Sequence, residues 1–426
     1  MQNLRIGTCG PVAMSRRAAF AAVSVAMLVW ADTGGVMAQP TITHLNVLPG
    51  GTLSAVSGIT DDGLIAVGYS ESPDRNTRAV RWTVCGEILD LGSLPGDPQA
   101  RARAISGDGR FMAGSSRGTQ IGSDRAVRWT GDGLLQELNM GPHWSDASAF
   151  AITSDGAALA GSGRLTTGIR HAFRWTATDL MQDLGTLPGG GSSDASGISG
   201  DGSVVVGVSY VRAGARAFHW TVETGMEDIG FLPGMTFSSA GAISRDGSTV
   251  TGWSSTAVSS RAFRWTRAGG MQNLGVVPGA IHSVGFAVSG DGSAVAGACG
   301  ITLNEWVAFL WTPELGIINL NSFLPSLGVD LAGWTLQRAT CISSDGSAIA
   351  GTGLFNGLSR SWLVSGLPIG SPSPCACDRN RDGELDSQDF FDFVEAFFTG
   401  NADFNRSCHT DSQDFFDFIS CFFGGC

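Results

Sequence analysis

The stretch His171-Ala172-Phe173-Arg174-Trp175-Thr176 decides how this chain folds, because close copies of it recur along the sequence. The copies end in Trp82, Trp129, Trp175, Trp220, Trp265 and, in a more divergent form, Trp311. Successive tryptophans are 47, 46, 45, 45 and 46 residues apart. A regular period of this length is typical of solenoid and propeller repeats.

Each period contains four short strand-like runs separated by turns. One copy runs through Ala195–Ser199, Ser203–Val208, Arg216–Trp220 and Met226–Gly230, with an Asp201-Gly202 turn after the first run. Alternating or β-branched runs broken by Asp-Gly and Gly turns indicate strands and hairpins. Four strands in a repeat of this size define a propeller blade.

The turns and strands also give the number of blades. The Asp-Gly turn between the first two strands occurs seven times, at Asp62, Asp108, Asp155, Asp201, Asp246, Asp291 and Asp345. The third strand occurs seven times if Arg360–Val364 is its last copy, whereas the fourth strand follows only six of these copies. The missing fourth strand matches Thr43–Gly50, which no blade precedes. We therefore predict an all-β, seven-bladed β-propeller over residues 39–365, with its last blade closed by the N-terminal strand so that no edge is exposed.

These repeats resemble the HAF-repeat family of extracellular proteins, whose name corresponds to His171-Ala172-Phe173 here. The resemblance covers roughly residues 41–365, and most copies carry Arg in place of His. It implies a repeat fold and an extracellular location, but no biochemical activity.

The N-terminal residues 1–38 have the pattern of a secretory signal peptide. Arg16 and Arg17 precede the apolar run Ala18–Trp30, which is too short for a stable membrane anchor, and small residues precede Gln39. We expect a secreted protein, extracellular or at the cell surface, exported by either the general or the twin-arginine route. No other segment is apolar enough to span a membrane, and a net charge of −12 argues against nucleic-acid binding.

A charged or amide residue follows the middle residue of the third strand by nine positions in six repeats. The pairs are Arg81/Asp90, Arg128/Glu137, Arg174/Asp183, His219/Asp228, Arg264/Asn273 and Leu310/Asn319. Because cross-strand neighbours of opposite charge attract one another, we predict a structural ladder from these pairs rather than a catalytic site.

The loops between strands two and three, and between successive blades, share one rim of a propeller. This rim carries arginines, aromatic residues and acids that suit a sugar or an anionic ligand, although an ordinary solvated surface would look the same. These residues are Arg117, Arg164, Arg170, Arg212, His143, Trp144, Phe237, His282, Glu71, Asp74, Asp97, Asp146, Asp194 and Glu305.

No catalytic constellation is recognisable in the repeats. The rim acids recur at no constant position, as a glycosidase carboxylate pair would need, and the sequence contains neither a Gly-x-Ser-x-Gly nor a His-Glu-x-x-His motif. We expect a non-catalytic binding or display protein. The alternative is a carbohydrate-active enzyme that degrades polysaccharides on the same scaffold.

A Pro/Ser/Gly linker at residues 366–374 separates the propeller from a second domain at residues 375–426. Composition changes sharply here, with 11 Asp and Glu against three Arg and with 11 of the 23 Phe. The domain opens with an EF-hand calcium loop, in which oxygen ligands recur at fixed positions around Gly383. The predicted calcium ligands of this first loop are Asp378, Asn380, Asp382, Glu384, Asp386 and Asp389.

A second copy of the loop begins 25 residues later. Its predicted ligands are Asp403, Asn405, Ser407, His409, Asp411 and Asp414. Ser407 replaces an acid, and Cys408 stands where Gly eases the sharp turn, so we expect calcium in the first loop and leave the second open.

Each loop leads into an expected helix with a phenylalanine stripe, which we interpret as the core of this domain. The stripe residues are Phe390, Phe391, Val394, Phe397 and Phe398, then Phe415, Phe416, Ile419, Phe422 and Phe423. Two such loop–helix units after a Pro/Ser linker resemble a type I dockerin, and Gly425-Cys426 resembles the Gly-Cys-type dockerins. The resemblance implies a cohesin-like or cell-surface anchoring partner, contacted by Ser387, Gln388, Ser412 and Gln413.

Cysteines concentrate in the same domain. Five lie at positions 375, 377, 408, 421 and 426, and three others are Cys85, Cys299 and Cys341. This density in a small exported domain indicates disulfides, although the sequence leaves their connectivity open. Cys299 and Cys341 lie in neighbouring repeats and are one candidate pair.

Overall fold

The computed structural model describes residues 40–424 except 121–122, 303, 370–376, 378–384, 386, 399–403 and 405–409. The predicted signal peptide therefore lies outside the described residues. Within the described ranges, no helix has both the length and the apolar character needed to cross a bilayer.

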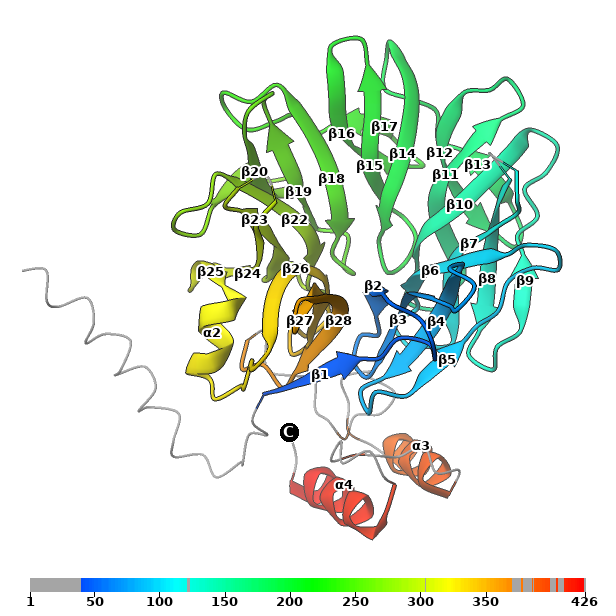
Figure 1. The fold of residues 1–426 in the computed structure, drawn as a ribbon. Helices are drawn as coiled ribbons and strands as arrows, with labels where there is room; N and C mark the ends of the chain where they lie inside the picture. Colours follow the sequence, from blue (N-terminus) through cyan, green and yellow to red (C-terminus); the bar gives the residue numbers. More distant parts are fainter. Residues whose placement is uncertain are drawn as a thin grey trace, which may run out of the picture. The chain divides into compact units, whose positions relative to one another are not determined.

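The repeats form seven antiparallel sheets of four strands each, arranged as the blades of a ring (Figure 1). Six blades use four consecutive strands in the order in which they occur in the chain. The predicted all-β, seven-bladed propeller is thus confirmed. Four blades in a row consist of β2 (Ser54–Ile59), β3 (Ile65–Glu71), β4 (Thr77–Thr83) and β5 (Ile88–Asp90); β6 (Gln99–Ile105), β7 (Phe111–Arg117), β8 (Asp124–Thr130) and β9 (Leu135–Glu137); β10 (Trp144–Ile152), β11 (Ala158–Leu165), β12 (Arg170–Thr176) and β13 (Leu180–Asp183); and β14 (Gly190–Ile198), β15 (Val205–Val211), β16 (Gly214–Thr221) and β17 (Gly225–Asp228).

The remaining three blades complete the ring. They consist of β18 (Phe237–Ile243), β19 (Thr249–Ser255), β20 (Ser260–Thr266) and β21 (Gly270–Gly275); β22 (His282–Val288), β23 (Val295–Gly300), β24 (Trp306–Thr312) and β25 (Gly316–Asn319); and β26 (Trp334–Ile342), β27 (Ile349–Phe355) and β28 (Leu358–Ser365) with β1 (Thr41–Leu45). We number the blades one to seven in this order.

The N-terminal strand closes blade seven, as predicted. β1 pairs antiparallel with β28, with Thr41 opposite Ser365 and Leu45 opposite Ser361, and the two strands lie side by side in Figure 1. The strand begins two residues earlier than the predicted Thr43 and ends at Leu45. It ends there because the Asn46 carbonyl accepts a hydrogen bond of 2.8 Å from Trp82 Nε1 of blade one.

The repeated tryptophan is a core residue of each blade. Trp82 and Trp129 are fully buried, and Trp175, Trp220 and Trp265 are less than 10% exposed. The hydrophobic clusters join consecutive blades. In one of them, Val206 and Ala217 of blade four pack with Ile243 and Phe263 of blade five. Each blade buries the aromatic side chains of this strand against a neighbouring blade. This burial explains why the strand recurs once in every repeat.

The Asp-Gly turns are held by a hydroxyl two residues before the aspartate. In blade four, Asp201 Oδ1 accepts hydrogen bonds from Ser199 Oγ at 2.6 Å and from the Ser203 N–H at 3.0 Å. Equivalent serine or threonine hydroxyls bond the aspartates of all seven turns. These aspartates are therefore turn residues, as Asx-type chemistry predicts.

Backbone hydrogen bonds join neighbouring turns from blade to blade. The Gly107 N–H donates to Ser154 O at 3.0 Å, and the Ser154 N–H donates to Gly200 O at 3.0 Å. Arg245 of blade five also forms an ion pair of 2.9 Å with Asp61 of blade one. These two blades are not adjacent in the ring, so this contact crosses the turn end of the propeller.

The predicted ladder of charged pairs nine positions apart is wrong, because the two residues of each pair do not face one another. Arg174 lies opposite Gln182, while Asp183 lies opposite Phe173, so Arg174 and Asp183 face opposite sides of the sheet. Arg174 Nε instead donates to Gly202 O of the next blade at 2.9 Å. Arg128 and Arg264 make the same contact with Gly156 and Gly292, so these arginines do link blades, but through backbone carbonyls.

The acids of the fourth strand instead bond a residue near the start of the third strand. Arg125 contacts Glu137 at 3.2 Å, His171 contacts Asp183 at 2.8 Å, and Arg216 contacts Asp228 at 3.7 Å. The spacing in each of these pairs is therefore twelve residues. A difference of one residue in register accounts for the error, because it moves a side chain to the other face.

One helix interrupts the blades without having been predicted. α2 (Leu320–Ser326) follows β25 and begins where the Asn319 side chain accepts a hydrogen bond from the Asn321 N–H. After the last strand, Leu367 is buried and Ile369 packs against the same hydrophobic cluster as α2. The first part of the predicted linker thus contacts the propeller core.

The C-terminal domain contains α3 (Ser387–Phe398) and α4 (Ser412–Gly424). Its core differs from the predicted stripe. Phe393 and Phe418 are fully buried and their rings stack 3.9 Å apart. Phe391, Phe398, Phe416 and Phe423 are instead 61–83% exposed. The prediction placed these four residues in the core, but each follows directly after a residue that faces the core. At 3.6 residues per helical turn, one position is enough to turn a side chain outward.

Cysteine pairing is partly resolved. Cys377 and Cys421 form a disulfide, which joins the start of the C-terminal domain to α4, and Cys85 is also disulfide-bonded. Cys299 and Cys341 are both free and buried, so the pair considered for neighbouring blades does not form. Burial raises the pKa of the Cys299 thiol to about 11, which keeps it protonated and unreactive.

Candidate functional site

Most of the charged residues predicted on the propeller rim are held in ion pairs. Arg164 pairs with Asp146 at 3.3 Å, and Arg170 pairs with Asp194 at 2.5 Å. Arg117 holds both oxygens of Asp124, at 2.7 and 2.8 Å. Much of the rim is therefore the ordinary surface that the sequence allowed as an alternative.

A pocket of about 220 Å³ interrupts this surface between blades one, two and three. We call it the rim pocket. Its lining combines arginines with hydroxyl and amide side chains and one phenylalanine. The lining residues are Thr77, Gln99, Ala100, Arg101, Arg103, Ser115, Arg117, Asp124, Ser148, Phe150 and Arg170. Arg117 and Arg170 were among the predicted rim residues, whereas Arg101 and Arg103 were missed.

Arg101 and Arg103 extend from the innermost strand of blade two into the rim pocket. The Arg101 guanidinium lies 4.7 Å from the centre of the Tyr69 ring, and that of Arg103 lies 5.5 Å from the Phe150 ring. The Arg103 Nε is buried and makes no hydrogen bond. Burial lowers the pKa of Arg103, and the charge of Arg101 lowers it further.

The inward positions of the innermost strand differ from blade to blade. At the position of Arg103, the other blades carry Ser57, Phe150, Ser196, Gly241, Phe286 and Thr340. At the position of Arg101 they carry Ala55, Ser148, Asp194, Ser239, Val284 and Arg338. Only blade two has arginine at both, so the fold itself does not require this pair. Alignment of the repeats column by column would have found the pair in the sequence.

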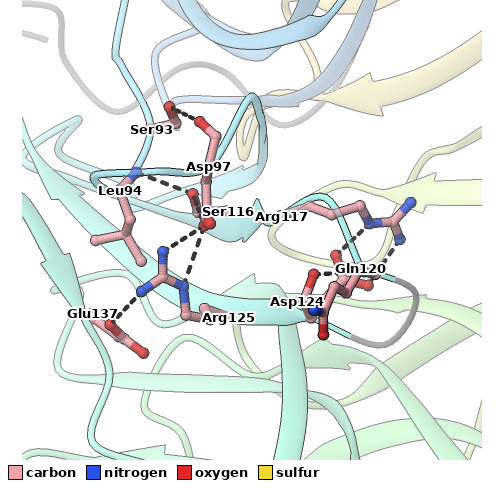
Figure 2. A network of polar contacts seen from close by, with 10 residues as sticks. Ser93, Leu94, Asp97, Ser116, Arg117, Gln120, Asp124, Arg125 and Glu137 are labelled. Atoms are coloured by element: carbon pink, nitrogen blue, oxygen red, sulfur yellow. Dashed lines mark hydrogen bonds and ion pairs between the residues drawn. The ribbon is translucent and has the colours of Figure 1, made fainter.

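A polar network lies beside the lining residues Arg117 and Asp124 and includes their sequence neighbours Ser116 and Arg125 (Figure 2). Arg125 lies between Asp97, at 2.8 Å, and Glu137, at 3.2 Å, while Asp97 also accepts a hydrogen bond of 2.7 Å from Ser116 Oγ. The Leu94 N–H donates to the same serine at 3.0 Å, which ties the inter-blade loop to β7. The charges of this network therefore compensate one another next to the rim pocket.

The rim pocket offers little for acid–base chemistry. Asp124 is the one carboxylate in its lining, and both of its oxygens accept hydrogen bonds from Arg117. The lining contains no histidine or cysteine. Its arrangement therefore suits the binding of an anion more than proton transfer.

In the C-terminal domain, the structure describes three of the predicted calcium ligands. Asp389 and Asp414 are fully buried, each as the third residue of its helix, and Asp411 precedes α4. Asp378, Asn380, Asp382, Glu384, Asp386, Asp403, Asn405, Ser407 and His409 lie outside the described residues. In the described part of the chain, no three metal-ligating side chains converge.

Asp411 and Asp414 cap α4 reciprocally. Asp411 Oδ1 accepts a hydrogen bond of 2.8 Å from the Gln413 N–H, and Asp414 Oδ2 accepts one of 2.8 Å from the Asp411 N–H. This arrangement is a capping box with aspartate at both positions. It holds two of the predicted ligand side chains at the loop–helix junction.

The four predicted partner-contacting residues are all exposed. Ser387 and Gln388 begin α3, and Ser412 and Gln413 begin α4. Gln388 Nε2 donates to Asp392 at 2.7 Å, and Gln413 Nε2 donates to Asp417 at 2.8 Å. The two helices thus present the same polar arrangement at their first turns.

Together, the fold and the rim pocket define a β-propeller with a ligand-sized site near its inner strands. No family model and no curated protein sequence matches this chain. Solved structures do resemble it. An oligogalacturonate lyase from Vibrio parahaemolyticus has a TM-score of 0.51 at 12% identity, with 76% of this chain and 93% of that chain covered.

Two further structures have similar folds. An oligogalacturonate lyase in complex with manganese has a TM-score of 0.51 at 13% identity, covering 76% of this chain and 92% of that chain. TolB from Acinetobacter baumannii has a TM-score of 0.42 at 13% identity, covering 69% and 77%. The two lyase structures, each with a TM-score of 0.51, support the propeller fold, and at 12–13% identity they assign no activity to this chain.

Proposed function

We propose that this chain is a secreted, non-catalytic binding propeller that is attached to an extracellular or cell-surface partner by a calcium-dependent, dockerin-like C-terminal domain. The observation that carries the proposal of a calcium domain is the burial of Asp389 and Asp414 at the same position of two short helices. A buried carboxylate is costly unless a cation or several hydrogen bonds compensate for it.

Calcium suits the chemistry of these loops. Carboxylate and amide oxygens are the ligands that this ion prefers, and both loops supply them in an EF-hand pattern. A domain of 52 residues is near the size at which a hydrophobic core alone is marginal. The disulfide between Cys377 and Cys421 supplies one constraint. Bound calcium would supply another, since its binding energy becomes folding energy.

The exposed side of the helices supports a role in attachment. Gln388, Phe391 and Phe398 follow one another at helical spacing along α3, and all three are exposed. Gln413, Phe416 and Phe423 repeat the arrangement on α4. Exposed aromatic residues beside polar anchors are typical of protein-binding faces, and a cohesin-like or cell-surface protein is the partner we propose.

For the propeller, we propose ligand binding without turnover. The lyases with a similar fold show that a propeller is compatible with catalysis in those proteins. Here the one carboxylate of the rim pocket is held by Arg117. An assay for sugar release from polysaccharides separates the two functions, and turnover that depends on a rim carboxylate would establish the carbohydrate-active enzyme instead.

Calcium titration calorimetry on the full-length protein tests the calcium domain. We expect Asp378→Ala to abolish most calcium binding and Asp403→Ala to have a smaller effect, because Ser407 and Cys408 already weaken the second loop. Glu395→Gln removes an equal charge from an exposed helix position and is the matched control. Absence of calcium binding, or equal protease resistance of the domain with calcium and with chelator, would refute the proposal.

A further inference from the structure

We propose that the rim pocket binds an acidic sugar, meaning a sugar ring that carries a carboxylate or a sulfate ester. The inference deepens the binding role proposed for the propeller by giving the class of its ligand. It rests on three features of the described residues: uncompensated positive charge, a lining rich in hydroxyl and amide groups, and arginines that the repeat does not need.

The positive charge of the rim pocket is not balanced by the protein. Arg117 and Arg170 have carboxylate partners, but the side chains of Arg101 and Arg103 form neither an ion pair nor a hydrogen bond with any described residue. The two guanidinium groups also repel one another. A half-buried guanidinium without an ion-pair partner is destabilising, and an oxyanion between the two would compensate both.

The neighbouring side chains suit a sugar better than a bare inorganic ion. Thr77, Gln99, Ser115 and Ser148 surround the two arginines, and they offer hydroxyl and amide groups that can exchange hydrogen bonds with sugar hydroxyls. The Phe150 ring adds an apolar surface for the ring face of a sugar. The volume of about 220 Å³ fits one such residue of a longer chain.

The arginine pair is confined to one blade. The other blades form the same sheets without an arginine at both inward positions, and among them only blade seven has one of the two, Arg338. The fold does not need this charged pair, and the pair lowers stability when no ligand is bound. Residues that break the pattern of a fold in this way are often found at functional sites.

The test is titration calorimetry on the full-length protein with four probes: trigalacturonate, its methyl ester, a sulfated galactose trisaccharide and the neutral trisaccharide. Chelator is present throughout, so that calcium neither bridges the probes nor occupies the C-terminal domain. We expect one or both acidic probes to bind roughly tenfold or more tightly than their neutral forms, and increasingly so as salt is lowered. The better acidic probe identifies the carboxylate or the sulfate as the natural group.

Arg101→Gln and Arg103→Gln should each weaken binding of the acidic probe by roughly tenfold or more. Arg110→Gln is the matched control, because it removes the same charge from a side chain that is 81% exposed and outside the rim pocket. We expect the control to bind within about twofold of the wild type.

Melting curves provide a second measurement. Arg103→Met should melt at or above the wild-type temperature without a probe, because it removes a half-buried charge that has no ion-pair partner. The acidic probe should raise the melting temperature of the wild type only. Equal binding of acidic and neutral probes would overturn the inference. So would an Arg101 or Arg103 variant that binds the acidic probe and is stabilised by it as the wild type is. Neither result bears on calcium binding, so a failure here leaves the proposed attachment domain intact.

Discussion

At the residue scale, one glycine in each second strand permits a close approach of backbones. In blade four, a Cβ at Gly207 would lie 2.0 Å from the Asp194 carbonyl oxygen. The approach is produced by a register shift in β14 between Ala195 and Gly197, which is a β-bulge. Equivalent bulges occur in the first strand of every other blade.

Gly207→Ala should therefore destabilise the propeller by about 1–3 kcal/mol, because the backbone of β14 would have to move away. Urea unfolding followed by tryptophan fluorescence measures the change. Gly191→Ala is the control on the same pair of strands, since a Cβ there would meet nothing within 4 Å. A Gly207→Ala variant as stable as this control would contradict the packing described.

At the element scale, β1 depends on His44 remaining neutral. The His44 ring lies 5.5 Å from Trp334 and 5.1 Å from Phe355, and its Nε2 is buried without a hydrogen bond. Burial lowers the pKa of His44 below 6.5, and the charge of Arg360 lowers it further. Folding thus favours the neutral imidazole, and this contribution is complete above the unfolded pKa and is lost as pH falls through the folded pKa.

We expect the melting temperature to fall as pH is lowered from about 7 to about 5, and to fall less in His44→Gln. His219 contributes to the same pH dependence, because burial and the charge of Arg267 lower its pKa. The contribution of His44 is therefore the difference in pH dependence between His44→Gln and the wild type. His143, which is exposed, is the control position. The same pH dependence in His44→Gln and wild type would show that β1 tolerates a charged imidazole.

At the scale of the whole molecule, the propeller is a ring whose stability depends on closure. β1 covers the edge of β28, and Leu45 is fully buried in the cluster that joins blades seven and one. At the end of the ring that carries the Asp-Gly turns, backbone hydrogen bonds join neighbouring blades, and the Asp61–Arg245 ion pair joins blades one and five. With β1 paired to β28, the blades leave only the short edges typical of a propeller.

Removing residues 39–50 should therefore lower the melting temperature by roughly 5 °C or more, or cause aggregation through the exposed edge of β28. Leu45→Ala alone should cost about 2–5 kcal/mol. Leu89→Ala, at a position that is 49% exposed, is the control. Differential scanning calorimetry and light scattering measure both effects, and a deletion variant that melts as the intact protein does would mean that the ring is not closed by β1.

A structural feature can be predicted from the sequence when residues close together in the chain cause it. Strand alternation and Asp-Gly turns are local and recur, so the seven blades and the closing strand were predicted correctly. The partner of Arg174 was not, because a register difference of one residue moves Asp183 to the other face. The phenylalanine stripe failed at Phe391 for a similar reason, since one helical position separates buried from exposed faces.

The rim pocket, by contrast, is created by packing between blades. Arg101 and Phe150 lie about one repeat apart in the chain and line the same cavity only because β6 and β10 are the inner strands of adjacent blades. The sequence by itself determined the repeat, the number of blades and the two helices of the C-terminal domain, since these follow from local periodicity and turn chemistry. Only the tertiary structure decided which arginines lack a partner, because that depends on every side chain that the neighbouring blades bring within reach.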